Sequence, residues 1–191
     1  MKTRYSRRGL LTLFLSCAFL VHLWAFVLIF KDFSMLIGRT SLWGAFGVLS
    51  YGLLFALIES VFVFLVAAVL GFLVSTRWDE PHRVALLGTL AMLATFWIML
   101  SQVWMMWDYQ SPGQSVLFIL QSQHPLRWFF AWISIVLAGV VLSLLAPAFL
   151  ILRSRGFFNF IQAVLDRTGF LTGFYLFLDA VAFIVVLVRN V

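Results

Sequence analysis

The sequence predicts an all-α integral membrane protein, a bundle of five transmembrane helices with an amphipathic inner interfacial helix and a short outer helical cap. Two observations predict this class. Hydrophobic residues make up 64% of the chain and charged residues only 10%, whereas soluble domains average roughly 45–50% apolar and about 25% charged residues. The apolar residues also form runs of about 18 residues or more, the length at which a helix spans the hydrocarbon core. A chain of 191 residues predicts a single transmembrane domain, 1–191.

Five apolar runs predict the spans in chain order: residues 10–30, 47–75, 84–107, 127–152 and 169–188. The first run follows Ser6-Arg7-Arg8-Gly9-Leu10-Leu11, which resembles a twin-arginine export signal. It lacks a good small-x-small cleavage site and continues to Phe30. We therefore expect an uncleaved first helix.

The second apolar stretch is longer than a membrane requires. It begins at Leu42, and a helix from there to residue 75 would be about 51 Å long against a hydrocarbon core of about 30 Å. Either this helix tilts strongly or residues 42–50 lie in the outer interface.

Two connecting segments predict further helices. In residues 153–169, apolar side chains fall on one helical face and polar ones on the other: Phe157, Phe160, Ile161, Val164 and Leu165 against Asn159, Gln162 and Asp166. This pattern is typical of an amphipathic helix lying in the inner interface. The apolar segment 116–120 is too short to span and is bracketed by Pro112-Gly113 and Pro125. It predicts a short helix capping the outer face.

The basic residues predict the orientation. Nine flank one side of the predicted spans, namely Lys2, Arg4, Arg7, Arg8, Arg77, Arg83, Arg153, Arg155 and Arg167. Four flank the other side, namely Lys31, Arg39, Arg127 and Arg189. Cytoplasmic loops carry the excess of Lys and Arg, so we expect a multi-pass protein of the cytoplasmic (inner) membrane, with its N-terminus inside and its C-terminus outside. Because the charges lie at span ends, the net charge of +6 does not indicate nucleic-acid binding.

Two acids, a histidine and a glutamine fall inside the apolar runs. A rise of about 1.5 Å per residue puts Asp179 at about 15 Å and His22 at about 18 Å from the inner edge. Glu59 lies at about 24 Å, close to Gln102 and Ser101 at about 25–27 Å. The sequence therefore predicts two polar levels, one holding His22 and Asp179 and the other holding Glu59 and Gln102.

Three interpretations of these residues stay open, because a charged side chain at mid-bilayer is costly and should face protein or water. In the first, Asp179 pairs with His22, Glu59 is protonated or bonded to Gln102 and Ser101, and both contacts lock helix packing. In the second, the residues line a path for protons, ions or a polar substrate, since a histidine–carboxylate pair can exchange a proton near neutral pH. In the third, an acid meets a basic residue of a partner subunit.

The inner ends of the spans also carry candidate contact residues. The predicted contacts with anionic lipid headgroups or a partner are Arg77, Arg83, Arg153, Arg155 and Arg167. Small residues spaced four apart predict close helix contacts at Ala67/Gly71, Gly139/Ser143 and Gly169/Gly173.

The small loops leave little room for soluble catalysis, so the leading hypothesis is a non-enzymatic membrane subunit or scaffold of a larger membrane complex. Its expected partners are the lipid bilayer and either other membrane subunits or a second copy, and any transport role runs past Asp179, His22 and Glu59.

Two other classes of function remain as alternatives. One is a stand-alone small transporter or channel that uses the intramembrane acids. The other is an outer-face lipid-modifying enzyme with Asp108, Tyr109 and His124 as its acid–base groups. We expect no cofactor and no metal, since Cys17 is the only cysteine and the three histidines lie at different depths.

Overall fold

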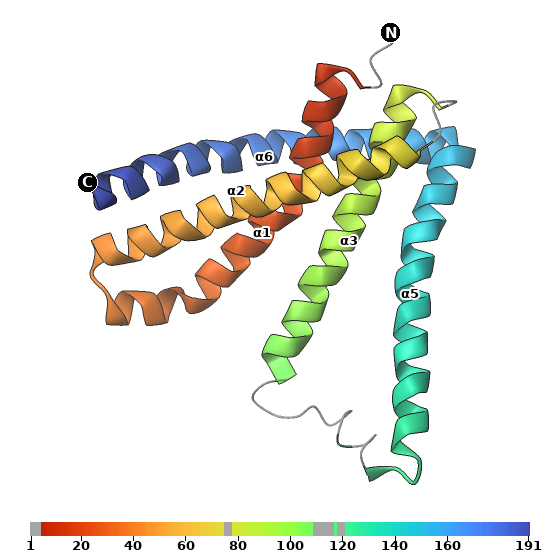
Figure 1. Cartoon of the computed structure of the whole chain (residues 1–191), viewed down its shortest axis with the longest axis horizontal. Coiled ribbons are helices and arrows are strands. Elements are labelled where there is room, and N and C mark those ends of the chain that lie inside the picture. The colour runs from red at the N-terminus through yellow and green to blue at the C-terminus, as the bar shows by residue number, and fades with distance from the viewer. Residues whose placement is uncertain (1–4, 75–77, 109–116, 118–120) are drawn as a thin grey trace.

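The computed structural model describes residues 5–74, 78–108, 117 and 121–191, with the backbone alone at residues 34 and 104–108. Its long helices in these ranges are α1 (Arg7–Arg39), α2 (Leu42–Leu73), α3 (Glu80–Asp108), α5 (Pro125–Arg153) and α6 (Arg155–Asn190) (Figure 1). All five are long and apolar enough to cross a membrane. The predicted all-α membrane bundle is confirmed.

The first two helices extend well beyond the predicted spans of residues 10–30 and 47–75. Only Thr40 and Ser41 separate α1 from α2. The Thr40 amide donates to the Leu36 carbonyl at 3.0 Å, which closes α1. The Ser41 hydroxyl oxygen accepts from the Gly44 amide at 3.1 Å and caps α2. With a cap at Ser41 and no proline in the stretch, residues 42–50 join α2 as one continuous helix.

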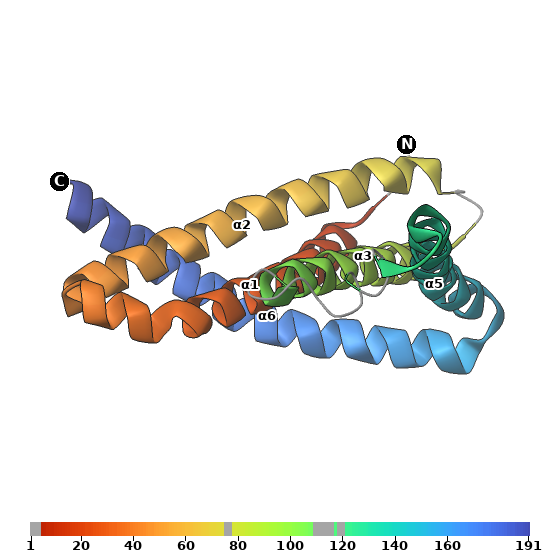
Figure 2. The ribbon, with the colours of Figure 1, turned by 90° about the horizontal axis from the view of Figure 1, so that it is seen from below.

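The segment predicted as a separate interfacial helix forms the first part of α6. Ser154 is the only residue between α5 and α6, and its hydroxyl oxygen accepts from the Phe157 amide at 3.4 Å. Beyond it the helix is unbroken to Asn190, because a break inside the apolar region would leave backbone groups without partners. Figure 2 shows that α6 nevertheless bends, so its light-blue first part and its darker end run in different directions. The predicted outer cap lies largely outside the described residues.

Helix α1 is the centre of the bundle. It packs against α2, α3 and α6, and it places Leu13 and Cys17 in a buried cluster with Ala67 of α2 and Leu87 of α3. Helix α5 contrasts with it, because among the described helices it packs against α3 and α6 alone. It stands apart from α1 and α2 in Figure 1.

The start of α1 is held by two other helices. The Tyr5 hydroxyl donates to the Gly71 carbonyl near the end of α2 at 3.2 Å. The backbone amide and the hydroxyl of Ser6 both donate to the Glu80 Oε1 atom of α3, at 2.7 and 2.6 Å. A carboxylate is also favourable beside the N-terminus of α1, where the helix dipole is positive.

Arg189 joins the end of α6 to the start of α2. Its Nη1 atom donates to the carbonyls of Trp43 and Gly44, at 3.1 and 3.3 Å. Gly47 makes room for this contact, because a Cβ at this position would overlap the guanidinium group. Asn190 adds a hydrogen bond of 2.7 Å from its Nδ2 atom to the Tyr51 hydroxyl.

Gly47→Ala should therefore separate Arg189 from α2 and lower the free energy of unfolding by about 1 kcal/mol, the usual contribution of an exposed hydrogen-bonded contact. Arg189→Ala should have a similar effect, and the double variant should lose no more than either single one. Unfolding of the four proteins in mixed detergent micelles measures this. Additive losses would contradict the contact.

Candidate functional site: a buried histidine–aspartate pair and an exposed acid

The first polar level is a direct contact between α1 and α6. The His22 Nε2 atom lies 2.8 Å from the Asp179 Oδ2 atom, and the two side chains are 0% and 3% exposed. The structure thus brings together the two residues that the depth estimate placed at the same level.

The His22 ring is fixed from three helices. Its Nδ1 atom lies 2.9 Å from the Ala18 carbonyl oxygen of its own helix and 3.4 Å from the Ser60 hydroxyl of α2. The Ser60 hydroxyl donates its hydrogen to the Ala56 carbonyl at 2.7 Å. The Tyr175 ring of α6 stacks on the imidazole with centroids 5.8 Å apart and planes at 9°.

These contacts determine how many protons the pair holds. A carbonyl only accepts hydrogen bonds, so the Nδ1 atom of His22 carries a hydrogen and donates it to Ala18. The 2.8 Å contact on the other side then needs one hydrogen between Nε2 and Oδ2, since two lone pairs would repel each other. The proton sits either on an imidazolium facing a carboxylate or on a carboxylic acid facing a neutral imidazole. Either way the pair has no net charge, which suits the interior of a membrane bundle.

The residues predicted for the second level line a groove and form no bonded cluster. Ser60, the neighbour of Glu59, lies 3.4 Å from the His22 ring, so Glu59 is at about the depth of His22 and not on a separate level. Glu59 and Gln102 line a groove of about 280 Å³, together with Val21, Trp24, Phe62, Val63, Thr95, Ile98 and Met99. Both polar side chains are exposed. Ser101 donates to the Ile98 carbonyl of its own helix at 2.7 Å. Within the described part of the chain, Glu59 forms no hydrogen bond or ion pair with either of them.

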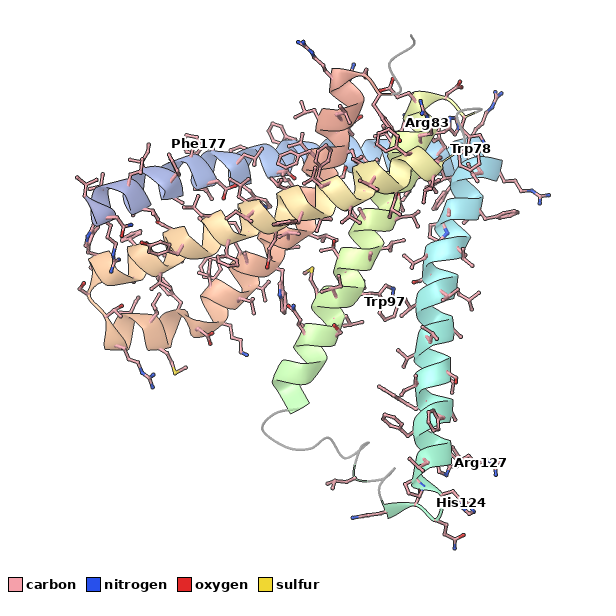
Figure 3. The ribbon with its side chains drawn as sticks, in the orientation of Figure 1. Trp78, Arg83, Trp97, His124, Arg127 and Phe177 are labelled. Carbon is pink, nitrogen blue, oxygen red and sulfur yellow. The ribbon has the colours of Figure 1, made fainter. Side chains whose placement is uncertain are left out.

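The predicted inner-face arginines divide into two kinds. Arg153, Arg155 and Arg167 are exposed, and the Arg153 guanidinium lies over the Phe149 ring of its own helix at 5.6 Å. Arg83 is only 7% exposed and lies over the Tyr5 ring at 4.9 Å, close to the start of α3 (Figure 3). Its charge therefore faces the chain's own N-terminal segment. Arg77 lies outside the described residues.

The small-residue pairs also differ among themselves. Ala67 and Gly71 are buried, and a Cβ at Gly71 would collide with Tyr5. Gly169 faces the Leu15 side chain, while no atom lies within 4 Å of a Cβ built at Gly139 or Gly173. Ser143 accepts from Trp97 Nε1 at 2.7 Å, which joins α5 to α3 (Figure 3).

Two hydroxyl residues of the site did not emerge from the sequence analysis. Besides Ser60, the fully buried Thr172 shares its single hydroxyl hydrogen between the Leu15 carbonyl at 3.1 Å and the Thr168 carbonyl at 2.8 Å, and so joins α6 to α1. The signal was present, since both are small polar residues inside apolar runs. Such residues are common in membrane helices because they can bond to their own carbonyls, and here both also do so.

Of the three residues of the enzyme hypothesis, His124 is the one whose side chain is described. It is exposed just before α5 and lines a pocket with Arg127. Tyr109 and the side chain of Asp108 lie outside the described residues. Comparison with known proteins adds no relative, since no protein-family model, curated protein or solved structure matches the chain.

Proposed function

We propose that this protein is a non-enzymatic integral subunit of a larger membrane complex. One observation carries the proposal: Glu59 is exposed within a membrane-spanning helix and has no partner within the described residues. About 21 Å of helix separates Glu59 from the end of α2 at Leu73, and about 26 Å separates it from the start at Leu42, so Glu59 lies in the middle part of this helix. An ionisable group at this depth is expected to meet another polar group, and a second membrane protein supplies one.

The buried His22–Asp179 pair differs from Glu59, and this difference supports the same conclusion. His22 Nε2 and Asp179 Oδ2 meet each other inside the chain at 2.8 Å, so helix packing accounts for this contact, while Asp179 Oδ1 is buried without a partner among the described residues. A conducting path past them would need access for water or ions, whereas the side chains are 0% and 3% exposed. The stand-alone transporter therefore has less support than the subunit.

The orientation proposed for this subunit places the N-terminus in the cytoplasm and the C-terminus outside the cytoplasmic membrane. The start of α1 lies against the end of α2 and the start of α3. The start of α3 lies in turn against the first part of α6, where the His82 ring stacks on Phe158 at 3.9 Å. One end of the bundle thus gathers most of the basic residues, as expected for a cytoplasmic face.

The experiment is to cross-link the protein in native membranes, extract it in mild detergent, and compare its size in wild type, Glu59→Gln and Asp166→Asn. Asp166 is the matched control, because it is an exposed carboxylate outside the groove. The wild type and the control should run in an assembly larger than one chain, and Glu59→Gln should leave at most a tenth of it. A wild type that runs as a single chain would overturn the proposed function.

A further inference from the structure

We infer that the groove between α1, α2 and α3 binds one transmembrane helix of a different protein, and that this helix carries a lysine or arginine that pairs with Glu59. The inference rests on the proposed function and names the partner of the same surface.

The groove has the composition of a helix-binding surface in a membrane. Its walls are mainly apolar, with Val21 and Trp24 from α1, Phe62 and Val63 from α2, and Ile98 and Met99 from α3. Its volume of about 280 Å³ accommodates a few side chains from one face of a helix. Packing of this kind is the main attraction between helices in lipid, where both the helix surface and its surroundings are apolar.

Charge then selects the chemistry of the partner. Among the described residues that line the groove, Glu59 is the one acid and none is basic. A carboxylate next to lipid is unfavourable unless a cation meets it, and a basic side chain is equally unfavourable alone. When the carboxylate and the basic side chain pair with each other, the free-energy cost of placing each of them in lipid is removed. Gln102 lies in the same groove and offers an additional amide to a guanidinium or ammonium group.

The helix register shows why a second copy of this chain does not fit. Asp179 contacts His22, and Thr172 contacts Leu15, each pair being 157 residues apart. Helices α1 and α6 therefore run parallel with a constant offset. Glu59 is at the level of His22, because its neighbour Ser60 lies 3.4 Å from the His22 ring.

The basic residues closest to this level are too far from it. Lys31 lies nine residues beyond His22 in α1, which is about 13 Å of helix, and Arg189 lies ten residues beyond Asp179 in α6, about 15 Å. Copies inserted in one membrane share an orientation, so each presents its basic side chains above or below the neighbour's Glu59. A cation at the right level must come from another protein.

The test uses the purified full chain reconstituted in phosphatidylethanolamine–phosphatidylglycerol vesicles. The probes are dansyl-labelled transmembrane peptides of leucine and alanine that differ only at the central residue, which is arginine, leucine or glutamate. Energy transfer from the chain's tryptophans reports binding, since Trp24 lines the groove. The arginine peptide should bind at least tenfold more tightly than the leucine peptide, and the glutamate peptide should bind most weakly.

The variants decide whether Glu59 is responsible. Glu59→Gln should reduce the arginine-to-leucine preference to about one, and Asp166→Asn should leave it unchanged. Equal binding of the peptides to wild type, or a preference that survives Glu59→Gln, would overturn the inference. The inference would also be overturned if a higher density of the chain in the vesicles displaced the arginine peptide, because a second copy of the chain would then occupy the groove.

The peptide-binding experiment and the assembly experiment can fail independently of each other. If the native assembly forms but the peptides bind equally, the chain is a subunit that uses a different surface, and only the inference fails. If the wild type is a single chain in native membranes, the proposed function fails whatever the peptides do.

Discussion

Asp179→Ala should lower the free energy of unfolding by about 1–3 kcal/mol, the usual effect of leaving a buried polar group without its partner. In this variant the His22 Nε2 atom, which lies 2.8 Å from Asp179 in the native chain, keeps no bond to α6. Asp179→Asn should be close to wild type. The asparagine amide can donate to Nε2 of a neutral imidazole, while Nδ1 continues to donate to Ala18.

Reversible unfolding in mixed detergent micelles measures these variants, and His22→Ala with the double variant completes a cycle. If His22 and Asp179 act mainly on each other, the double variant should lose clearly less than the sum of the two single losses. If Asp179→Asn is as unstable as Asp179→Ala, a neutral group at position 179 is not sufficient. The pair would then need a carboxylate facing an imidazolium. A stable Asp179→Ala variant would show that the contact contributes little.

The His22–Asp179 contact also shows which part of a membrane fold is predictable from one sequence. Depth follows from counting residues along a helix, because the rise per residue is constant. The estimate placed the two residues within about 3 Å of each other in depth, and they are in contact. Five spanning helices followed from composition and run length in the same way.

Rotation about each helix axis was not predictable, because it is set by packing between helices. Glu59 and Gln102 do share a level and line one groove, but depth alone could not show that both are exposed there. Arg83 was expected to face headgroups, whereas Tyr5 covers it. Hydrophobic periodicity gives little help in such helices, since lipid and protein interior are both apolar.

The positions at which helices end were also not predictable from the sequence. The amphipathic pattern of residues 153–169 predicts a helix, but it does not determine whether that helix stops before the next span. Ile161 and Leu165 are buried against Ala85 and Ile151, so this face packs on protein. The segment is therefore held as a continuation of α6.

Leu13→Ala should produce the other large loss, about 2–3 kcal/mol. Leu13 is 0% exposed and lies in the cluster that joins α1 to α2 and α3. Deletion of a buried leucine side chain typically lowers stability by about 2–5 kcal/mol. We expect the lower part of this range, because the apolar reference state in a membrane reduces the transfer contribution and leaves mainly the lost packing.

Leu11→Ala is the matched control for this loss, since Leu11 lies in the same helix and is 56% exposed. Lipid fills the space left by the Leu11 side chain, so the unfolding midpoint of Leu11→Ala should stay near that of wild type. Equal losses for the two variants would show that α1 is not the packing centre of the bundle. A large loss for Leu13→Ala alone would instead mean that α2 and α3 depend on α1 for their position. The groove that holds Glu59 lies between these three helices, so peptide binding should weaken in the same variant.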